Sequence, residues 1–379
     1  MRCAFLLWFG CLASTVVAGE PLLKTAATEE GSLLWYDALE IGVEGRNWNE
    51  VEAPYDRLPA KAKATVRDAV WNLSRHSAGM CVRFRSNAPH IHARWTVTSA
   101  KLEMPHMPAT GVSGVDLYAR DDAGVWRWVA CGKPTAQSST AHLAQGISPL
   151  PAEGAPSSSG REYRLYLPLY NGTQKLEIGI PKESDLFRPE PYPADRIQPV
   201  VFYGTSITHG ACASRPGMCH PAILGRRLDR PTVNIGFSGN GRMELELADL
   251  LAEIDAAVYV LDCLPNMNPA EVKERTEPFI QRMREKKPNV PLLLVEDRTY
   301  ADALFHKDKR QRNDDSRREY RAAYERLQAA GVTGLHYLEG EHLLGDDNEG
   351  TVDSSHPSDL GFWRQADAMT PILKKILTP

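Results

Sequence analysis

The sequence predicts an α/β protein in which an N-terminal β-sandwich precedes a doubly wound, five-stranded parallel sheet. The chain has 379 residues, whereas an ordinary domain has about 100–200, so two domains are expected. Before residue 196, short segments alternate strictly between polar and apolar residues, which is typical of half-buried strands. After it, continuous apolar runs alternate with stretches of helical periodicity, which is typical of a parallel sheet covered by helices.

The composition excludes several classes of protein. Apolar residues make up 42% of the chain and charged residues 24%, which is the balance of a folded protein and not of a disordered one. The 44 basic and 48 acidic residues give a net charge of −4, which argues against a general binder of nucleic acid. We therefore expect an enzyme or a binding protein for an uncharged ligand.

Residues 1–19 are predicted to be a secretory signal peptide. Arg2 precedes a short apolar run, and small residues up to Ala18 and Gly19 are typical of a cleavage site. A buried N-terminal helix is the alternative, but the composition changes abruptly after Gly19. The run is too short for a transmembrane helix, and no other stretch is apolar enough to span a membrane. We expect a secreted or periplasmic protein.

The cysteines and histidines indicate no metal or cofactor. Cys212 and Cys219 are close enough in sequence to pair, which the sequence leaves open, and no C-x-x-C pair of a zinc ribbon is present. His90 and His92 share one face of a predicted strand, with His106 nearby, but surface histidines explain this more simply than zinc. Because an odd number of cysteines remains after the predicted cleavage, at least one thiol must be free. The remaining cysteines are Cys81, Cys131, Cys212, Cys219 and Cys263.

The region 20–195 is predicted to form the β-sandwich. Alternating segments with turn residues between them, and almost no helical periodicity, favour this architecture. Residues 121–124 have the composition of a hairpin turn. The predicted strands are 81–85, 91–97, 115–119, 126–129, 163–167 and 175–180.

The region 196–379 is predicted to form the doubly wound sheet. Apolar residues spaced i, i+3, i+4 and i+7, as from Leu247 to Ile254, indicate helices between the strands, and a last helix is expected after Pro357. In such sheets ligands bind beyond the carboxyl ends of the strands, so the functional residues are expected there. The predicted strands are 199–203, 232–235, 257–261, 291–295 and 334–338.

Ser206 and His356 are candidates for nucleophile and general base. Ser206 lies in a Gly/Ser/Thr turn directly after the first apolar run, where a hydroxyl can face solvent, although the turn lacks the second glycine of G-x-S-x-G. Asp353 precedes His356 by three residues, so one loop can supply both a base and the acceptor that orients its ring. A simple turn, and an N-cap aspartate beside an incidental histidine, are the alternatives.

Two further turns carry candidate donors for an oxyanion. The stretch 234–241 after the second run contains Gly239, and its glycines allow the backbone to approach a ligand. The stretch 261–267 after the third run contains Asn266, whose amide can donate a hydrogen bond.

These four blocks, in this order, resemble the SGNH (GDSL-type) hydrolase superfamily over roughly residues 197–379. The resemblance implies a flavodoxin-like α/β/α sandwich, with Ser206 as nucleophile and with the Ser206 N–H, Gly239 and Asn266 as oxyanion donors. It implies Asp353 and His356 as the base pair. The chain departs from the pattern, since it has G-T-S-I for G-D-S-L and P-N-M for G-x-N-D. The missing aspartate after Asn266 leaves the orientation of that amide open.

The segment 114–118, with the sequence G-V-D-L-Y, is similar to the G-x-D-L-Y signature of a β-domain that precedes one SGNH subgroup. This resemblance implies that the β-sandwich, jelly-roll-like, packs against the hydrolase and shapes its cleft. Three residues near the blocks are candidates for contact with substrate. His209 is expected to form a wall of the cleft, and Arg215 and Arg242 to bind a polar substrate or to form ion pairs.

The sequence thus predicts a secreted serine esterase that needs no cofactor, and the family resemblance implies that it removes small O-acyl groups, above all acetyl, from carbohydrate. The expected partner is an acylated small molecule or polysaccharide. A lipase or lysophospholipase, and a catalytically inactive glycan-binding protein, are the alternatives. The oligomeric state is not indicated.

Overall fold

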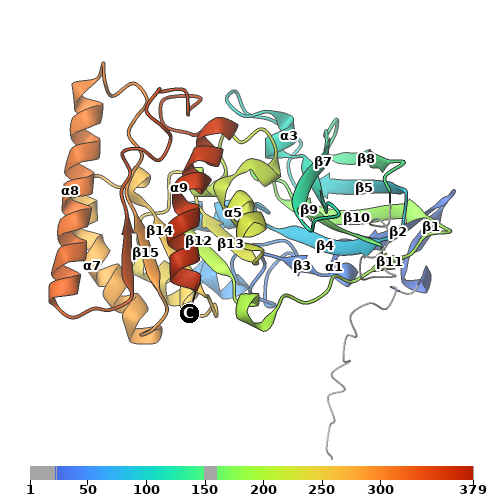
Figure 1. Cartoon of the computed structure of the whole chain (residues 1–379), viewed down its shortest axis with the longest axis horizontal. Coiled ribbons are helices and arrows are strands. Elements are labelled where there is room, and N and C mark those ends of the chain that lie inside the picture. The colour runs from blue at the N-terminus through green and yellow to red at the C-terminus, as the bar shows by residue number, and fades with distance from the viewer. Residues whose placement is uncertain (1–21, 23, 149–159, 379) are drawn as a thin grey trace, which may run out of the picture.

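The computed structural model describes residue 22 and residues 24–148 and 160–378 (Figure 1). The predicted signal peptide, residues 1–19, lies outside the described residues. None of the helices in the described ranges is both long enough and apolar enough to cross a membrane. The antiparallel strands occupy one side of the molecule in Figure 1, and the parallel sheet with its helices occupies the other.

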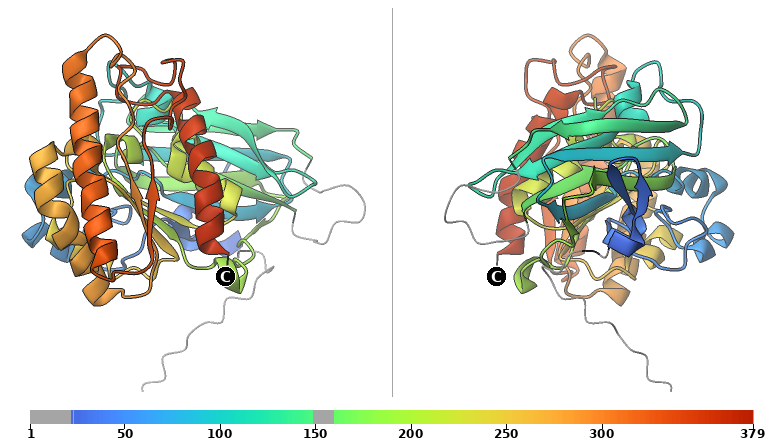
Figure 2. Two further views of the ribbon diagram at one scale, coloured as in Figure 1. Left: turned by 60° about the vertical axis from the view of Figure 1, so that its left-hand side comes forward. Right: turned by 90° about the vertical axis from the view of Figure 1, so that its right-hand side faces the viewer.

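The N-terminal part contains two antiparallel sheets that face each other across an apolar core, which confirms the predicted β-sandwich (Figure 2). Phe84 and Leu165 from one sheet and Trp95 and Ile178 from the other are buried in this core. One sheet has the order β1 (Thr28–Glu30), β2 (Leu33–Asp37), β10 (Thr173–Pro181), β5 (His90–Val97) and β8 (Ser138–Gln145). The other has the order β11 (Leu186–Phe187), β4 (Cys81–Ser86), β9 (Arg161–Tyr166), β6 (Val115–Arg120) and β7 (Trp126–Gly132), with β3 (Val43–Glu44) paired to β4.

The C-terminal part contains a parallel sheet in which the first strand lies between the second and the third, as in flavodoxin-like folds. Every residue of β12 and β14 is buried, which explains why these strands are continuous apolar runs. All five strands begin within one residue of the predicted position. Their order in the sheet is β13 (Thr232–Gly236), β12 (Val200–Gly204), β14 (Val258–Asp262), β15 (Leu292–Val295) and β16 (Leu335–Leu338).

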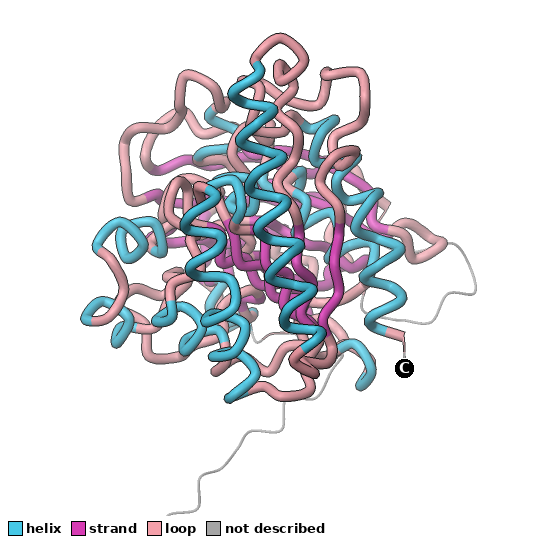
Figure 3. The backbone as a smooth tube through the Cα atoms, turned by 90° about the vertical axis from the view of Figure 1, so that its left-hand side faces the viewer, coloured by secondary structure: helices cyan, strands magenta, loops and turns pink. Residues whose placement is uncertain are grey.

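Helices cover both faces of this sheet (Figure 3). Side chains from α5 (His220–Leu228) and α9 (Asp359–Leu377) pack on one face, against Phe202 and Val260. The other face packs against α6 (Leu245–Leu251), α7 (Pro269–Lys286) and α8 (Lys307–Ala329).

Part of the N-terminal region completes this second core, which the sequence did not indicate. The segment that carries η2 (Ala60–Ala64) and α2 (Asp68–Ser74) places Leu58, Val70 and Trp71 in the same cluster as the buried residues of α6 and α7. The domain boundary at residue 196 stays a prediction, but this hydrophobic cluster contains residues from both sides of it.

Arg57 joins the two parts by donating hydrogen bonds to four backbone carbonyls, two in each part. The residue is 1% exposed, and its guanidinium donates to the carbonyls of Asn234 (3.0 Å) and Gly236 (2.7 Å) on β13. Because β13 is the edge strand of its sheet, the carbonyls on its outer side lack a neighbouring strand. The same guanidinium donates to the carbonyls of Leu73 (2.7 Å) and His76 (2.9 Å) at and just after the C-terminal end of α2.

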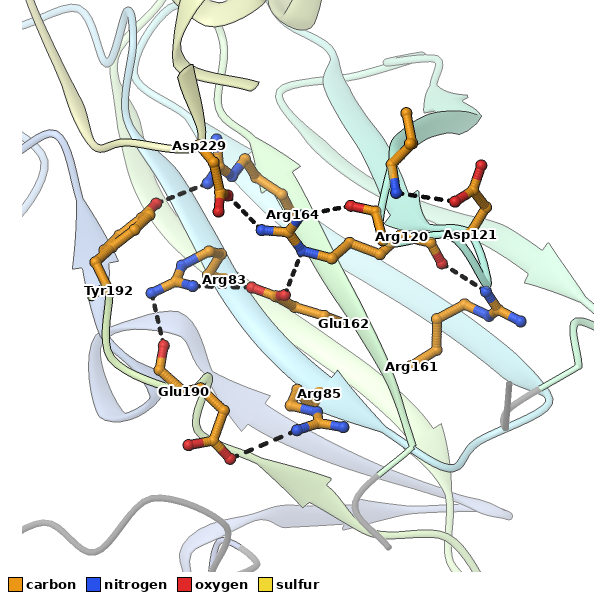
Figure 4. A network of polar contacts seen from close by, with 12 residues as sticks. Arg83, Arg85, Arg120, Asp121, Arg161, Glu162, Arg164, Glu190, Tyr192 and Asp229 are labelled. Atoms are coloured by element: carbon orange, nitrogen blue, oxygen red, sulfur yellow. Dashed lines mark hydrogen bonds and ion pairs between the residues drawn. The ribbon is translucent and has the colours of Figure 1, made fainter. Parts of the chain in front are cut away.

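Ion pairs on the outer face of the β4–β9–β6 sheet join it to α5 (Figure 4). Arg120 lies between Glu162 on β9 and Asp229, the residue that ends α5. Arg83 bonds to Glu162 at 2.8 Å, and Arg164 donates to the hydroxyl of Tyr192 at 2.7 Å. The network fixes the sheet against the C-terminal part.

The substitution Arg57→Met is expected to lower the free energy of unfolding by at least about 3 kcal/mol, because it removes four hydrogen bonds to backbone carbonyls, two of them fully buried. Urea denaturation measures the change. The control is Arg318→Met on the exposed face of α8, where the side chain is 63% exposed and a change within about 0.5 kcal/mol is expected. Equal effects of the two variants would contradict this account of Arg57.

Candidate active site

Ser206, His356 and Asp353 form a continuous chain of hydrogen bonds at the carboxyl end of the parallel sheet. The Oγ atom of Ser206 lies 2.8 Å from Nε2 of His356, and Nδ1 of His356 lies 2.7 Å from Oδ2 of Asp353. These are the contacts that a serine nucleophile, its general base and the orienting carboxylate require.

Ser206 is held by the turn from β12 into the short helix α4 (Ser206–His209). Thr205 caps this helix by accepting a hydrogen bond from the Ile207 N–H at 3.3 Å. Since Ser206 is the first helical residue, its own N–H has no acceptor within the helix and can serve a ligand. The Tyr170 hydroxyl, from the N-terminal part, donates to the Ser206 carbonyl at 3.2 Å. The residue is only 7% exposed, so the hydroxyl lies at a narrow opening.

Asp353 and His356 are held in a single tight turn. Ser354 between them has φ of +75°, a left-handed conformation that is costly for a serine. The turn is fastened to the segment after β15, since Ser354 bonds to Asp302 and its carbonyl accepts from the Ala301 N–H at 2.9 Å. This segment therefore fixes the position of the base.

The carboxylate of Asp353 remains ionised although it is partly buried. Burial raises its pKa, but hydrogen bonds from the His356 backbone N–H at 2.8 Å and from the imidazole outweigh this effect and lower the pKa below its usual value. A carboxylate that keeps its charge holds the proton on Nδ1 of His356 and leaves Nε2 to face Ser206.

The glycine loop after β13 lies directly against the nucleophile turn. A Cβ atom on Gly241 would lie 1.9 Å from the Gly204 carbonyl oxygen, so only glycine allows this approach. Gly239 has φ of +70° and faces open space. Arg67 from the N-terminal part donates to the side chain of Asn240 at 2.6 Å, which fastens the loop from outside.

Asn266 lies at the other side of this loop, in η5 (Leu264–Asn266) after β14. Its amide nitrogen contacts the Phe237 carbonyl at 3.3 Å. This contact keeps the nitrogen on the side of the glycine loop without the aspartate that the family pattern places after the asparagine. The backbone N–H groups of Asn240 and Gly241 donate to the same carbonyl, so Asn266 and the glycine loop share one acceptor.

A buried ion pair that the sequence reasoning missed supports the nucleophile helix. Asp262 at the end of β14 is fully buried and receives two hydrogen bonds from Arg298, at 2.5 and 2.6 Å. The same carboxylate accepts from the Thr208 hydroxyl in α4 at 3.1 Å. The sequence signal that could have found this pair is an aspartate, Asp262, directly after the predicted strand 257–261.

His209 does not form a wall of the cleft, so that expectation is wrong. The side chain is fully buried, and its Nε2 bonds to the Leu169 carbonyl at 2.8 Å. Its ring stacks on Tyr170 with centroids 4.1 Å apart and contacts His76. His209 is therefore part of the packing under the nucleophile turn, because α4 directs it toward the N-terminal part.

Arg215 and Arg242 both bond to the protein itself, which was one of the two options for each. Arg215 pairs at 2.7 Å with Asp116, the buried aspartate of the G-V-D-L-Y segment, which also accepts from the Gly217 N–H and the Trp128 indole. Arg242 donates to the Gly239 carbonyl at 3.1 Å and so holds the glycine loop.

Cys212 and Cys219 are both free, so the possible disulfide is not formed. The Cys212 thiol lies close to the proposed base pair, since its sulfur and ligand atoms of Asp353 and His356 all lie within 4.8 Å of one another. Burial, together with the charge of Asp353, raises the pKa of Cys212 to about 12, so the thiol stays protonated and does not compete as a nucleophile.

The N-terminal part also supplies a wall beside His356. The loop 101–108 and Val352 line a cavity of about 860 Å³, and the ring of His106 lies 6.0 Å from that of His356. His106 therefore lies at the cleft. His90 and His92 lie on β5 instead, where His92 stacks on His142 of β8 with centroids 4.1 Å apart.

The chain resembles known esterases along both parts. Residues 197–374 match the model of the GDSL-like lipase/acylhydrolase family, and residues 33–186 match that of the N-terminus of SGNH-hydrolase-type esterases. A solved structure from Bacteroides ovatus, named as a GDSL-like lipase, is 33% identical with a TM-score of 0.83, over 91% of this chain and 98% of that chain.

Two more distant structures share the fold. The salicylyl-acyltransferase SsfX3 from a tetracycline biosynthetic pathway is 17% identical, with a TM-score of 0.66 over 92% of this chain and 96% of that chain. A family two carbohydrate esterase from Cellvibrio japonicus is 13% identical, with a TM-score of 0.56 over 91% and 98%. No match was found among curated protein sequences.

Buried neutral histidines are expected to make stability fall below about pH 6.5. Burial, with the charge of Arg57, lowers the pKa of His76 to about 4 and that of His209 well below its usual value. Below about pH 6.5 the unfolded chain therefore binds more protons than the folded one, so each such histidine removes about 1.4 kcal/mol per pH unit from the free energy of unfolding. Urea titrations between about pH 7 and pH 5 measure this slope.

The variant His209→Gln should flatten this pH dependence. The control is His342→Gln, because His342 is exposed and the hydrogen bond that it donates to Asp346 raises its pKa, so its removal cannot flatten the slope. A slope that is the same in His209→Gln as in the unmodified chain would show that His209 is not the group that titrates.

Proposed function

The chain belongs to the GDSL-like lipase/acylhydrolase family and is an ester hydrolase, and we propose that it removes small O-acyl groups, above all acetyl, from carbohydrate outside the cytoplasm. The observation that carries the proposal is the hydrogen-bonded chain from Ser206 through His356 to Asp353. An inactive glycan-binding protein would have no need of this arrangement.

In the proposed reaction, His356 Nε2 takes the proton of Ser206 as Oγ attacks the ester carbonyl carbon. The N–H groups of Ser206 and Gly239 and the amide of Asn266 stabilise the oxyanion that forms. His356 then gives the proton to the departing alcohol, which leaves an acyl-enzyme. A water molecule, deprotonated by His356, attacks the acyl carbon, and His356 returns the proton to Ser206 Oγ as the acyl bond breaks and the carboxylic acid leaves.

Two features support a short acyl group and a sugar alcohol. Ser206 is only 7% exposed, which favours a small group at the reacting carbon. The fold is shared with a family two carbohydrate esterase, which supports a carbohydrate by analogy of fold. Export rests on the predicted signal peptide at residues 1–19, together with this choice of substrate.

The substitution Ser206→Ala is expected to reduce kcat for p-nitrophenyl acetate by at least about 1,000-fold, because the nucleophile is lost. The matched control is Ser138→Ala. Ser138 is an exposed serine on β8, which belongs to a different sheet from the one that ends at Ser206. Its activity should equal that of the unmodified chain. Full activity of Ser206→Ala would overturn the mechanism.

A lipase with a longer acyl group is the second candidate, and one observation favours it. The cavity beside His356 is lined by Leu102, Met104 and Met107, which could receive an alkyl chain. A series of p-nitrophenyl esters of increasing chain length separates the two candidates. The proposal expects kcat/KM to fall steeply beyond acetate, and a maximum at eight or more carbons (about the length that fills an apolar groove) would favour the lipase. Acetate release from an acetylated polysaccharide tests the carbohydrate.

A further inference from the structure

A second cavity lies on a different face of the protein, where the two parts meet beside α5 and α9. It has a volume of about 610 Å³, within the range of about 300–1,000 Å³ typical of ligand sites. The hairpin of β6 and β7 lines it from the N-terminal part, and residues of α5 and α9 line it from the C-terminal part. None of its lining residues belongs to the site of Ser206 or to the loop 101–108.

Exposed aromatic side chains form part of its wall. Trp128 on β7 is 52% exposed and Trp363 on α9 is 47% exposed, and both are among the few large apolar side chains that face solvent in the described ranges. Each is held in place, since Trp128 donates to Asp116 at 2.9 Å and Trp363 lies under the guanidinium of Arg227 at 4.5 Å. Fixed indole faces bind flat apolar surfaces at low entropic cost.

The wall is also rich in arginine, and one of these arginines forms no ion pair among the described residues. Five arginines and a single carboxylate, Asp229, line the cavity. Arg120, Arg127, Arg215 and Arg227 each form an ion pair with an aspartate. Arg226 forms none among the described residues. Its guanidinium lies 3.9 Å from the centre of the Tyr118 ring, and one of its nitrogens donates to the Gly217 carbonyl at 2.8 Å.

Two buried donors of this wall lack acceptors in the described part of the chain. They are Nη1 of Arg226 and Nε1 of Trp126, a residue that is 8% exposed. Buried N–H groups are nearly always paired, so two unpaired donors behind one wall are an unusual feature of this cavity. A guanidinium without a carboxylate favours an acceptor that carries negative charge.

We propose that this cavity binds an acidic saccharide, with the apolar faces of sugar rings on Trp128 and Trp363 and a carboxylate directed to Arg226. Indole faces fit the C–H groups of a pyranose ring, and a uronate supplies both the anion and several hydroxyl acceptors. The site is non-catalytic, and it would hold a charged glycan against the protein while the separate site of Ser206 acts on esters.

The experiment uses the full chain with Ser206→Ala, so that binding is measured without turnover. Isothermal titration with trigalacturonic acid is expected to give saturable binding, and uncharged xylotriose is expected to bind at least about 10-fold more weakly because it cannot pair with Arg226. The variants Trp363→Ala and Arg226→Gln should each weaken binding of trigalacturonic acid at least about 10-fold. Phe305→Ala, another exposed aromatic residue outside the cavity, should leave binding unchanged.

Three outcomes would overturn the proposal. They are the absence of saturable binding, equal affinity for the charged and uncharged trisaccharides, and unchanged affinity in Trp363→Ala. Because Arg226 is packed against Tyr118, Arg226→Lys is measured beside Arg226→Gln, and it should retain part of the affinity by keeping the charge. Hydrolysis of p-nitrophenyl acetate by Trp363→Ala with Ser206 intact should be unchanged, which separates failure at this cavity from failure of the proposed esterase.

Discussion

The position of the glycine loop after β13 depends on a buried positive charge that has no carboxylate partner among the described residues. The guanidinium of Arg57 is surrounded by four carbonyls and by the ring of Phe237, whose centre lies 5.1 Å away. Burial lowers the pKa of Arg57 to about 9, which is still high enough to keep the charge at neutral pH. Carbonyl dipoles take the place of an anion here. Because two of these carbonyls end β13, the glycine loop that follows begins from a fixed point.

The N-terminal part is consequently more than an accessory domain, because its residues support the candidate site in the C-terminal part. Residues from η2 and α2 fill a face of the parallel sheet, Tyr170 holds the nucleophile turn, and Arg67 holds the glycine loop. Asp116 acts in the opposite direction. Its carboxylate, in the β-sandwich, accepts hydrogen bonds from Arg215 and from the Gly217 N–H in the C-terminal part. The shape of the site therefore depends on contacts from both directions across the predicted boundary.

The sequence predicted those features that local pattern determines. The five parallel strands were found because strands buried on both faces are continuous apolar runs. Ser206 and His356 were expected to lie close together because the carboxyl ends of such strands meet at one edge, and the structure places them in contact. β8 was missed because its small polar residues do not alternate clearly. Arg57 and the burial of His209 were beyond pattern analysis, since a buried arginine or histidine has the same letter as an exposed one and only tertiary packing distinguishes them.

The turn that carries both Asp353 and His356 has a mechanical consequence. Asp353 and His356 belong to one four-residue turn closed by its own hydrogen bonds, so a displacement of the turn carries both side chains with it. Such a displacement changes the position of Nε2 relative to Ser206 more than the distance between the imidazole and the carboxylate. Contacts of Ser354 with Asp302 and with the Ala301 N–H on the neighbouring segment oppose this displacement.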